Sequence, residues 1–87
     1  MKSVRFESKA YQDFINWAGL DKNIFRKINQ LIRDIDRDPY SGLGKPESLK
    51  YELQGWWSRR INQEHRLIYK VEQDTIIIVG CKGHYLS

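Results

Sequence analysis

The sequence has 87 residues, with 15 Lys or Arg against 11 Asp or Glu, and its net charge of +4 favours a polyanionic partner only weakly. This length fits one small domain with one hydrophobic core, so we expect residues 1–87 to form a single domain. One cysteine excludes an intramolecular disulfide and argues against a Cys/His zinc site, and no run approaches the ~20 apolar residues of a membrane span, so we expect a cytoplasmic protein.

The first half of the chain predicts one strand followed by two helices. Residues 2–6 alternate weakly and predict a short strand. Ser8 is a candidate cap for a helix that runs to about residue 18, with Gly19 as its stop. Asp21 is a candidate cap for a second helix, which Pro39 ends because the residue before a proline disfavours the helical region. The apolar stripes expected to be buried are Tyr11, Phe14, Ile15 and Ala18 in the first helix and Ile24, Ile28, Leu31, Ile32 and Ile35 in the second.

The second half predicts a loop and then strands. A loop rich in glycine and proline covers residues 39–50. Short polar connections join the last three strand-like segments, which predicts an antiparallel meander. The order of elements indicates an α+β protein, in which both helices pack on one face of an antiparallel sheet. The four strand-like segments cover residues 50–53, 57–61, 66–72 and 75–81.

Alternation along these strands assigns side chains to two faces of the sheet. Leu67 and Tyr69 belong to the row that we expect to meet the helices, whereas Arg66 begins the row on the open face. Arg59 and Arg60 are consecutive in one strand, so they point to opposite faces. At most one of these two arginines therefore lies on the open face, and the other is structural or binds a partner.

Glu47, Arg66 and His84 are the residue types that metal-free RNA cleavage needs. A carboxylate can take the proton from a 2′-OH, a guanidinium can hold the charge of the phosphorane, and an imidazolium can protonate the departing 5′-oxygen. Arginine suits the phosphoryl group because its planar fork can contact two oxygens at once. A loop beside the open face could bring Glu47 near Arg66, and the last strand would bring His84.

Each of these three residues also has a structural or solvated interpretation. Glu47 can be a solvated loop carboxylate, or an acidic residue in a first helical turn that the helix dipole favours. Arg66 can be a surface arginine paired with Glu52 or Glu64. His84 can be an exposed side chain near the end of the sequence. The residues by themselves leave these alternatives open.

Four runs carry a resemblance to a known family. In order along the chain they resemble the Txe/YoeB family of bacterial toxins, a branch of the RelE superfamily of ribosome-dependent mRNA endonucleases. The resemblance extends from the strand near Val4 to Tyr85 and implies a RelE-like, microbial RNase-like α+β fold. The runs are Gly-Lys-Pro-Glu-Ser-Leu-Lys (44–50), Trp-Trp-Ser-Arg-Arg-Ile (56–61), Glu-His-Arg-Leu-Ile-Tyr (64–69) and Cys-Lys-Gly-His-Tyr (81–85).

The resemblance implies a role for each candidate residue. Glu47 would be the general base, Arg66 would stabilise the phosphorane and His84 would be the general acid. Tyr85 would stack on a base or orient the scissile phosphate. No metal or cofactor would be needed, and the products would carry a 2′,3′-cyclic phosphate or 3′-phosphate and a 5′-hydroxyl. The basic residues expected to contact RNA are Lys45, Lys50, Arg60 and Lys82.

The same resemblance implies partners. The toxin would enter the ribosomal A site and cut the mRNA there. A cognate antitoxin with an acidic, partly disordered C-terminal segment would wrap the toxin, and only the complex of the two would bind operator DNA. A homodimer is a further assembly that the family admits, and no membrane partner is implied.

Three other functions are compatible with such a chain. It could block translation or bind RNA without cutting, or it could inhibit DNA gyrase, as a similar fold in the superfamily does. Its site could also have decayed, for which Gly83 is the only hint. Relatives usually carry arginine and a bulkier residue where this chain has Lys82 and Gly83, and often a second proline where it has Ser48. Gly83 adds backbone freedom directly before His84.

Overall fold

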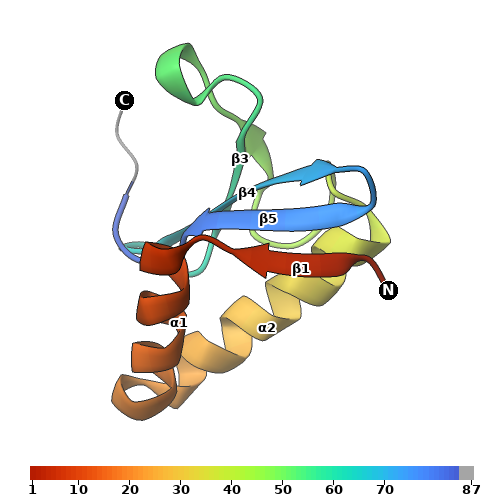
Figure 1. The fold of residues 1–87 in the computed structure, drawn as a ribbon. Helices are drawn as coiled ribbons and strands as arrows, with labels where there is room; N and C mark the ends of the chain where they lie inside the picture. The colour runs from red at the N-terminus through yellow and green to blue at the C-terminus, as the bar shows by residue number, and fades with distance from the viewer. Residues whose placement is uncertain (85–87) are drawn as a thin grey trace.

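The computed structural model describes residues 1–84, which fold into two helices, one short 3-10 helix and a five-stranded sheet. Both α-helices lie on the same side of the sheet (Figure 1). Among the described residues, no helix is long and apolar enough to cross a membrane. The elements in chain order are β1 (Ser3–Phe6), α1 (Ser8–Leu20), α2 (Lys22–Arg37), β2 (Glu47–Ser48), η1 (Tyr51–Leu53), β3 (Trp57–Arg60), β4 (Arg66–Glu72) and β5 (Thr75–Gly80).

The sheet has the strand order β1-β5-β4-β3-β2. Strands β3, β4 and β5 form the predicted antiparallel meander. The predicted α+β fold with both helices on one face of the sheet is confirmed, but the sheet is not antiparallel throughout, because β1 pairs with β5 in parallel, with Ser3 opposite Thr75. The chain between β1 and β5 is long enough for it to re-enter the sheet in the same direction, as a parallel pair requires. The sheet is therefore mixed.

The segment before β3 also differs from the prediction. Residues 50–53 do not form a strand: Tyr51–Leu53 is a turn of 3-10 helix that begins with Tyr51 at a φ of 57°. The expected loop instead contains the edge strand β2, which pairs with β3 through Glu47 and Ser48. A two-residue strand carries no alternation of its own, so its pattern could not be recognised in the sequence.

The helix signals were right for α2 and partly wrong for α1. The Asp21 carboxylate accepts hydrogen bonds from the backbone N–H groups of Asn23 and Ile24, at 3.0 and 3.2 Å, and so caps α2 as predicted. In α1 the N-cap position is Glu7 rather than Ser8, and no side chain caps this helix. The helix also continues through Gly19 to Leu20, because a glycine weakens a helix without ending it.

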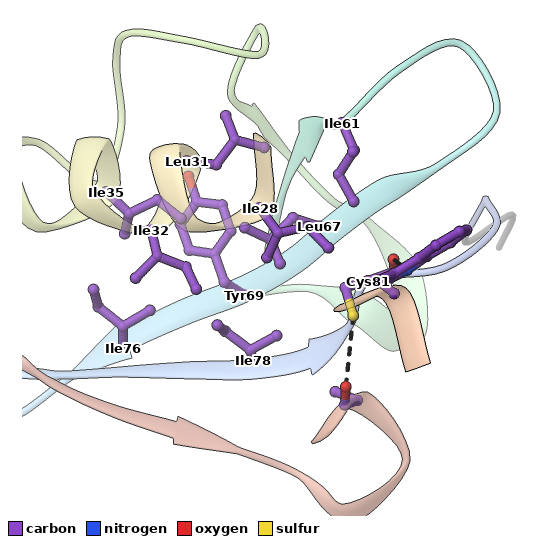
Figure 2. Packing of buried hydrophobic residues seen from close by; sticks show 12 residues of the cluster. Ile28, Leu31, Ile32, Ile35, Ile61, Leu67, Tyr69, Ile76, Ile78 and Cys81 are labelled. Carbon is purple, nitrogen blue, oxygen red and sulfur yellow. Dashed lines mark hydrogen bonds between the residues drawn. The ribbon is translucent and has the colours of Figure 1, made fainter. Parts of the chain in front are cut away.

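The core lies between the helices and the sheet, and Figure 2 shows its side chains from close by. The predicted stripe of α2 is confirmed, with Ile28, Leu31 and Ile35 fully buried. The stripe predicted for α1 was wrong for Tyr11 and Ile15, which are exposed; α1 instead buries Ala10 and Trp17. From the sheet, the buried partners of this core include Leu67, Tyr69, Ile76 and Ile78. These rows place the other face of β3 and β4 away from the helices.

Candidate active site

A cleft of about 460 Å³ lies on the face of the sheet opposite the helices. Residues from several parts of the sequence line it. Lys45 lies in the loop and Glu47 in β2, Arg60 lies in β3 and Arg66 in β4, and His84 follows β5. The cleft therefore brings together the carboxylate, the guanidinium and the imidazole that the sequence singled out.

Strand register explains why these side chains meet. Glu47 lies opposite Ser58 on β3, and Ser58 lies opposite Ile68 on β4. Two residues further along, Arg60 lies opposite Arg66. Side chains two residues apart share a face, so all of these residues project on the open side of the sheet. Ser58 and Ile68 form part of the lining of the cleft, and the alternation that predicted Arg66 on this face would also have found them.

A close backbone contact at Gly44 brings the loop onto β3. The N–H of Arg60 donates to the carbonyl of Gly44 at 2.7 Å, and Gly44 has a φ of 78°. A Cβ atom at this position would lie 2.9 Å from the Arg60 carbonyl oxygen, closer than real Cβ contacts allow. Glycine is therefore required here, both for its conformation and for the close approach, and Glu47 follows three residues later.

Arg66 is held by the turn that precedes β4. Its Nη1 atom donates to the carbonyl oxygens of Asn62, Gln63 and His65, at 2.7, 3.3 and 3.1 Å. Within the described residues, Arg66 forms no ion pair with a carboxylate, and its Nε and Nη2 atoms have no hydrogen-bond partner. The guanidinium is thus fixed through one nitrogen, while the other two remain able to bind phosphoryl oxygens. The carbonyl groups that hold it left no signal in the sequence, because every residue has one.

His84 is brought to the cleft by backbone pairing beyond the end of β5. The N–H of Arg66 donates to the carbonyl of Gly83 at 3.0 Å, so the chain stays beside the start of β4. His84 is exposed, and its Nε2 atom lies 2.9 Å from the carbonyl oxygen of Gln63. A carbonyl oxygen can only accept a hydrogen bond, so this contact suits an N–H at Nε2. Tyr85, the fourth predicted catalytic residue, lies outside the described residues.

The predicted RNA-binding residues divide into two groups. Lys45 and Arg60 line the cleft. Lys50 and Lys82 are exposed but are not part of its lining. Among the described residues, no group of three or more His, Cys, Asp and Glu side chains is arranged to hold a metal ion. The cleft residues include acid–base groups, Glu47 and His84, and phosphate-binding groups, Lys45, Arg60 and Arg66.

Arg59 lies on the opposite face and organises the chain that leads into the cleft. It is fully buried, and its guanidinium binds the Asp34 carboxylate and the hydroxyl of Tyr69. Burial raises the pKa of Tyr69, whose hydroxyl in turn donates to a backbone carbonyl of the loop. The remaining N–H groups of Arg59 donate to the carbonyl oxygens of Asp38, Ser41 and Leu43. These bonds fix the course of residues 38–43, which lead to Gly44 and Glu47.

Asp34 is the charged partner in this network. Its pKa lies well below the usual range, because Arg37 and the backbone N–H of Leu43 donate to the carboxylate and Arg59 adds a further bond. The ionised form is therefore strongly favoured in the folded protein.

Comparison with known proteins assigns this chain to a family. A family model described as a YoeB-like toxin of bacterial type II toxin–antitoxin systems matches residues 6–85. Toxin YoeB of Streptomyces coelicolor is 48% identical to this chain over 82 residues, which cover 94% of this chain and 98% of the relative.

Two solved structures from Staphylococcus aureus have the same fold. A YoeB–YefM complex is 43% identical with a TM-score of 0.91, covering 98% of this chain and 99% of the other. A YoeB dimer is 45% identical with a TM-score of 0.91, covering 97% and 98%. The family match spans nearly all of the described fold and every cleft residue. This chain belongs to the YoeB-like toxins of bacterial type II toxin–antitoxin systems.

Proposed function

We propose that residues 1–87 form one endoribonuclease domain, which enters the ribosomal A site and cuts the mRNA that is being translated. The observation that carries this proposal is the shared cleft of Glu47, Arg66 and His84, flanked by Lys45 and Arg60. A carboxylate and an imidazole on one positively charged surface suit the transfer of two protons around a phosphodiester. A gyrase inhibitor or a passive RNA-binding surface needs no such pair.

The reaction is an in-line attack within the RNA. Glu47 takes the proton from the 2′-OH, and the 2′-oxygen forms a bond to the phosphorus. Arg66 binds the phosphoryl oxygens through the nitrogens that the turn leaves free, and so stabilises the charge of the phosphorane. The bond from phosphorus to the 5′-oxygen then breaks, and His84 donates a proton to that oxygen. The products are a 2′,3′-cyclic phosphate, which hydrolysis opens to a 3′-phosphate, and a 5′-hydroxyl.

The basic residues bind the rest of the RNA. Lys45 and Arg60 contact phosphates beside the scissile one, whereas Lys50 and Lys82 lie outside the cleft and contact flanking phosphates of mRNA or ribosomal RNA. Tyr85 stacks on a base or orients the scissile phosphate. In this mechanism, no step is assigned to a metal ion or a cofactor.

A cognate antitoxin is the proposed regulator. The S. aureus relative was solved as a YoeB–YefM complex, which supports a partner of the same kind for this chain. The acidic, partly disordered C-terminal segment of the antitoxin would fold over the positively charged cleft. Only the complex of toxin and antitoxin would bind operator DNA. The YoeB dimer of the same organism supports a homodimer in the absence of antitoxin. We place the free toxin in the cytoplasm, where ribosomes are.

The proposal is tested by mapping 5′ ends of a defined mRNA in a reconstituted translation reaction, with and without ribosomes. Wild-type protein should cut within the A-site codon only when ribosomes are present, and the downstream fragments should carry a 5′-hydroxyl. Glu47→Gln and His84→Gln should each slow the reaction by about 10²- to 10⁴-fold. Arg66→Gln should do the same, because the phosphorane charge loses its donor.

A matched control is Arg5→Gln, which removes an exposed guanidinium from β1 at the opposite edge of the sheet from β2. This variant should cut at the wild-type rate. Translation arrest with intact mRNA, unchanged in the three cleft variants, would instead identify a non-catalytic ribosome blocker. If the protein stopped purified gyrase from supercoiling DNA, that result would instead identify a gyrase inhibitor.

A further inference from the structure

His65 is a buried histidine outside the cleft that contacts the segment carrying His84. Its Nδ1 atom accepts a hydrogen bond from the backbone N–H of Gly83 at 2.8 Å. The ring packs edge-to-face on Trp17, with 4.8 Å between the ring centroids. Only 7% of His65 is exposed, so solvent does not readily replace a lost bond. The hydrogen bond joins His65 to Gly83, the residue directly before the proposed general acid.

The direction of this bond identifies the tautomer of His65 that makes it. A ring nitrogen that accepts a hydrogen bond carries no proton, so the neutral ring must carry its proton on Nε2. The Nε2 atom lies 3.6 Å from a carboxylate oxygen of Glu64, which suits an N–H on that side. A doubly protonated ring would instead point an N–H at the N–H of Gly83. The neutral Nε2–H tautomer is therefore the form that holds this segment.

The segment from Cys81 to His84 needs this hydrogen bond because Gly83 gives its backbone conformational freedom. Gly83 has a φ of 75°, and no atom lies within 4 Å of the position of a Cβ, so packing does not restrain it. Upstream, the indole N–H of Trp17 donates to the carbonyl of Cys81 at 3.0 Å. At Gly83 itself the restraints among the described residues are two hydrogen bonds, one from Arg66 N–H and one to His65. Only the second involves a side chain.

We propose that His65 is a positioning residue for His84. Its neutral imidazole holds the Gly83 peptide, and the His84 ring is thereby aimed into the cleft, with its Nε2 atom beside the carbonyl oxygen of Gln63. This inference rests on the proposed function, in which His84 protonates the leaving oxygen. Loss of the His65 acceptor should reduce the rate of cleavage by about 10- to 100-fold, since a general acid displaced by about 1 Å loses that much.

Two substitutions separate the loss of the hydrogen-bond acceptor at His65 from the loss of ring packing on Trp17. His65→Phe retains an aromatic ring against Trp17 and removes the acceptor. His65→Asn removes the ring, but its side-chain oxygen can occupy the place of Nδ1 and accept from Gly83. Thermal unfolding of both variants, measured first, sets an assay temperature at which each is folded. Single-turnover cleavage on ribosomes should then be slow for His65→Phe and restored towards wild type for His65→Asn, with the half-saturating toxin concentration unchanged in both.

A modified substrate tests whether the defect acts through His84. An mRNA with sulfur in place of the bridging 5′-oxygen at the mapped cut site has a leaving group that departs as a thiolate and needs no proton, because thiols are far more acidic than alcohols. His84→Gln and His65→Phe should both regain most of the lost rate on this mRNA. Glu47→Gln should stay slow, because it acts on the attacking oxygen.

The outcomes distinguish a failure of the proposed role of His84 from a failure of the positioning role of His65. If His84→Gln is not rescued by sulfur, the proposed role of His84 fails, and the positioning role fails with it. If sulfur rescues His84→Gln but not His65→Phe, the mechanism stands and the positioning role is overturned. The positioning role is also overturned if His65→Phe cuts ordinary mRNA at the wild-type rate, or if His65→Asn is as slow as His65→Phe.

Discussion

Arg59 and Arg60 are consecutive residues of β3, and their guanidinium groups lie on opposite faces of the sheet. Arg59 is fully buried against Asp34 and Tyr69, whereas Arg60 is exposed and lines the cleft. Arg59 therefore stabilises the fold, whereas Arg60 belongs to the candidate site.

This separation predicts opposite effects of the same substitution. Arg59→Met should lower the free energy of unfolding by about 3 kcal/mol or more, because it leaves Asp34 and several loop carbonyls without their donor. Arg60→Met should change it by about 0.5 kcal/mol or less, as exposed substitutions do. Urea denaturation at neutral pH measures both. Equal losses in the two variants would contradict the assignment of Arg59 to the fold and Arg60 to the site.

The Asp34 carboxylate predicts a particular sensitivity to acid. Its pKa is lower in the folded protein than in the unfolded chain, chiefly because Arg37, the N–H of Leu43 and Arg59 donate to it. The stabilisation is therefore complete above the unfolded value of about 3.9 and is lost as the pH falls below it. The free energy of unfolding of Asp34→Asn should fall less steeply than that of wild type between about pH 5 and pH 2. Parallel curves from urea titrations over this range would show that the contacts of Asp34 do not favour its charge.

Gly44 and Gly83, which precede Glu47 and His84 in the chain, predict unequal costs for the same added methyl group. Gly44→Ala meets the Arg60 carbonyl at 2.9 Å, whereas Gly83→Ala has open space, and both positions have a positive φ. Gly83→Ala should therefore cost about 1 kcal/mol from backbone strain alone. Gly44→Ala should cost more and should also loosen the β2–β3 pairing that places Glu47. Urea denaturation gives the stabilities, and hydrogen exchange of the Arg60 N–H reports whether its bond to Gly44 persists.

Cys81 predicts an unreactive thiol. Burial, with a smaller contribution from Asp13, raises the pKa of Cys81 to about 12, so the reactive thiolate is scarce near neutral pH. It is the one cysteine in the sequence, so labelling reports a single site. At pH 8 a disulfide reagent such as dithionitrobenzoate should label the native protein orders of magnitude more slowly than the urea-unfolded protein. Labelling of the native protein at the rate of the unfolded one would show that Cys81 is accessible.

The sequence by itself determined the type of most helices and strands and which of their faces are buried. The spacing of Ile28, Leu31 and Ile35 predicted the buried face of α2, because a helix brings every third or fourth residue to one side. Alternation along β4 likewise placed Leu67 and Tyr69 in the core and Arg66 opposite them. Helical spacing and strand alternation depend only on residues close together in the sequence, so they can be recognised without knowledge of the fold. The identities of Glu47, Arg66 and His84 as candidates also came from the sequence.

Only the tertiary structure decided how these candidates are held together. The parallel pairing of β1 with β5, the edge strand at Glu47 and the choice between Arg59 and Arg60 all depend on partners distant in sequence. The carbonyl groups that fix Arg66 and the His65 bond to Gly83 are contacts of backbone atoms, which every residue possesses. A backbone atom has no sequence signature, so the positions of the reactive groups follow from packing and register.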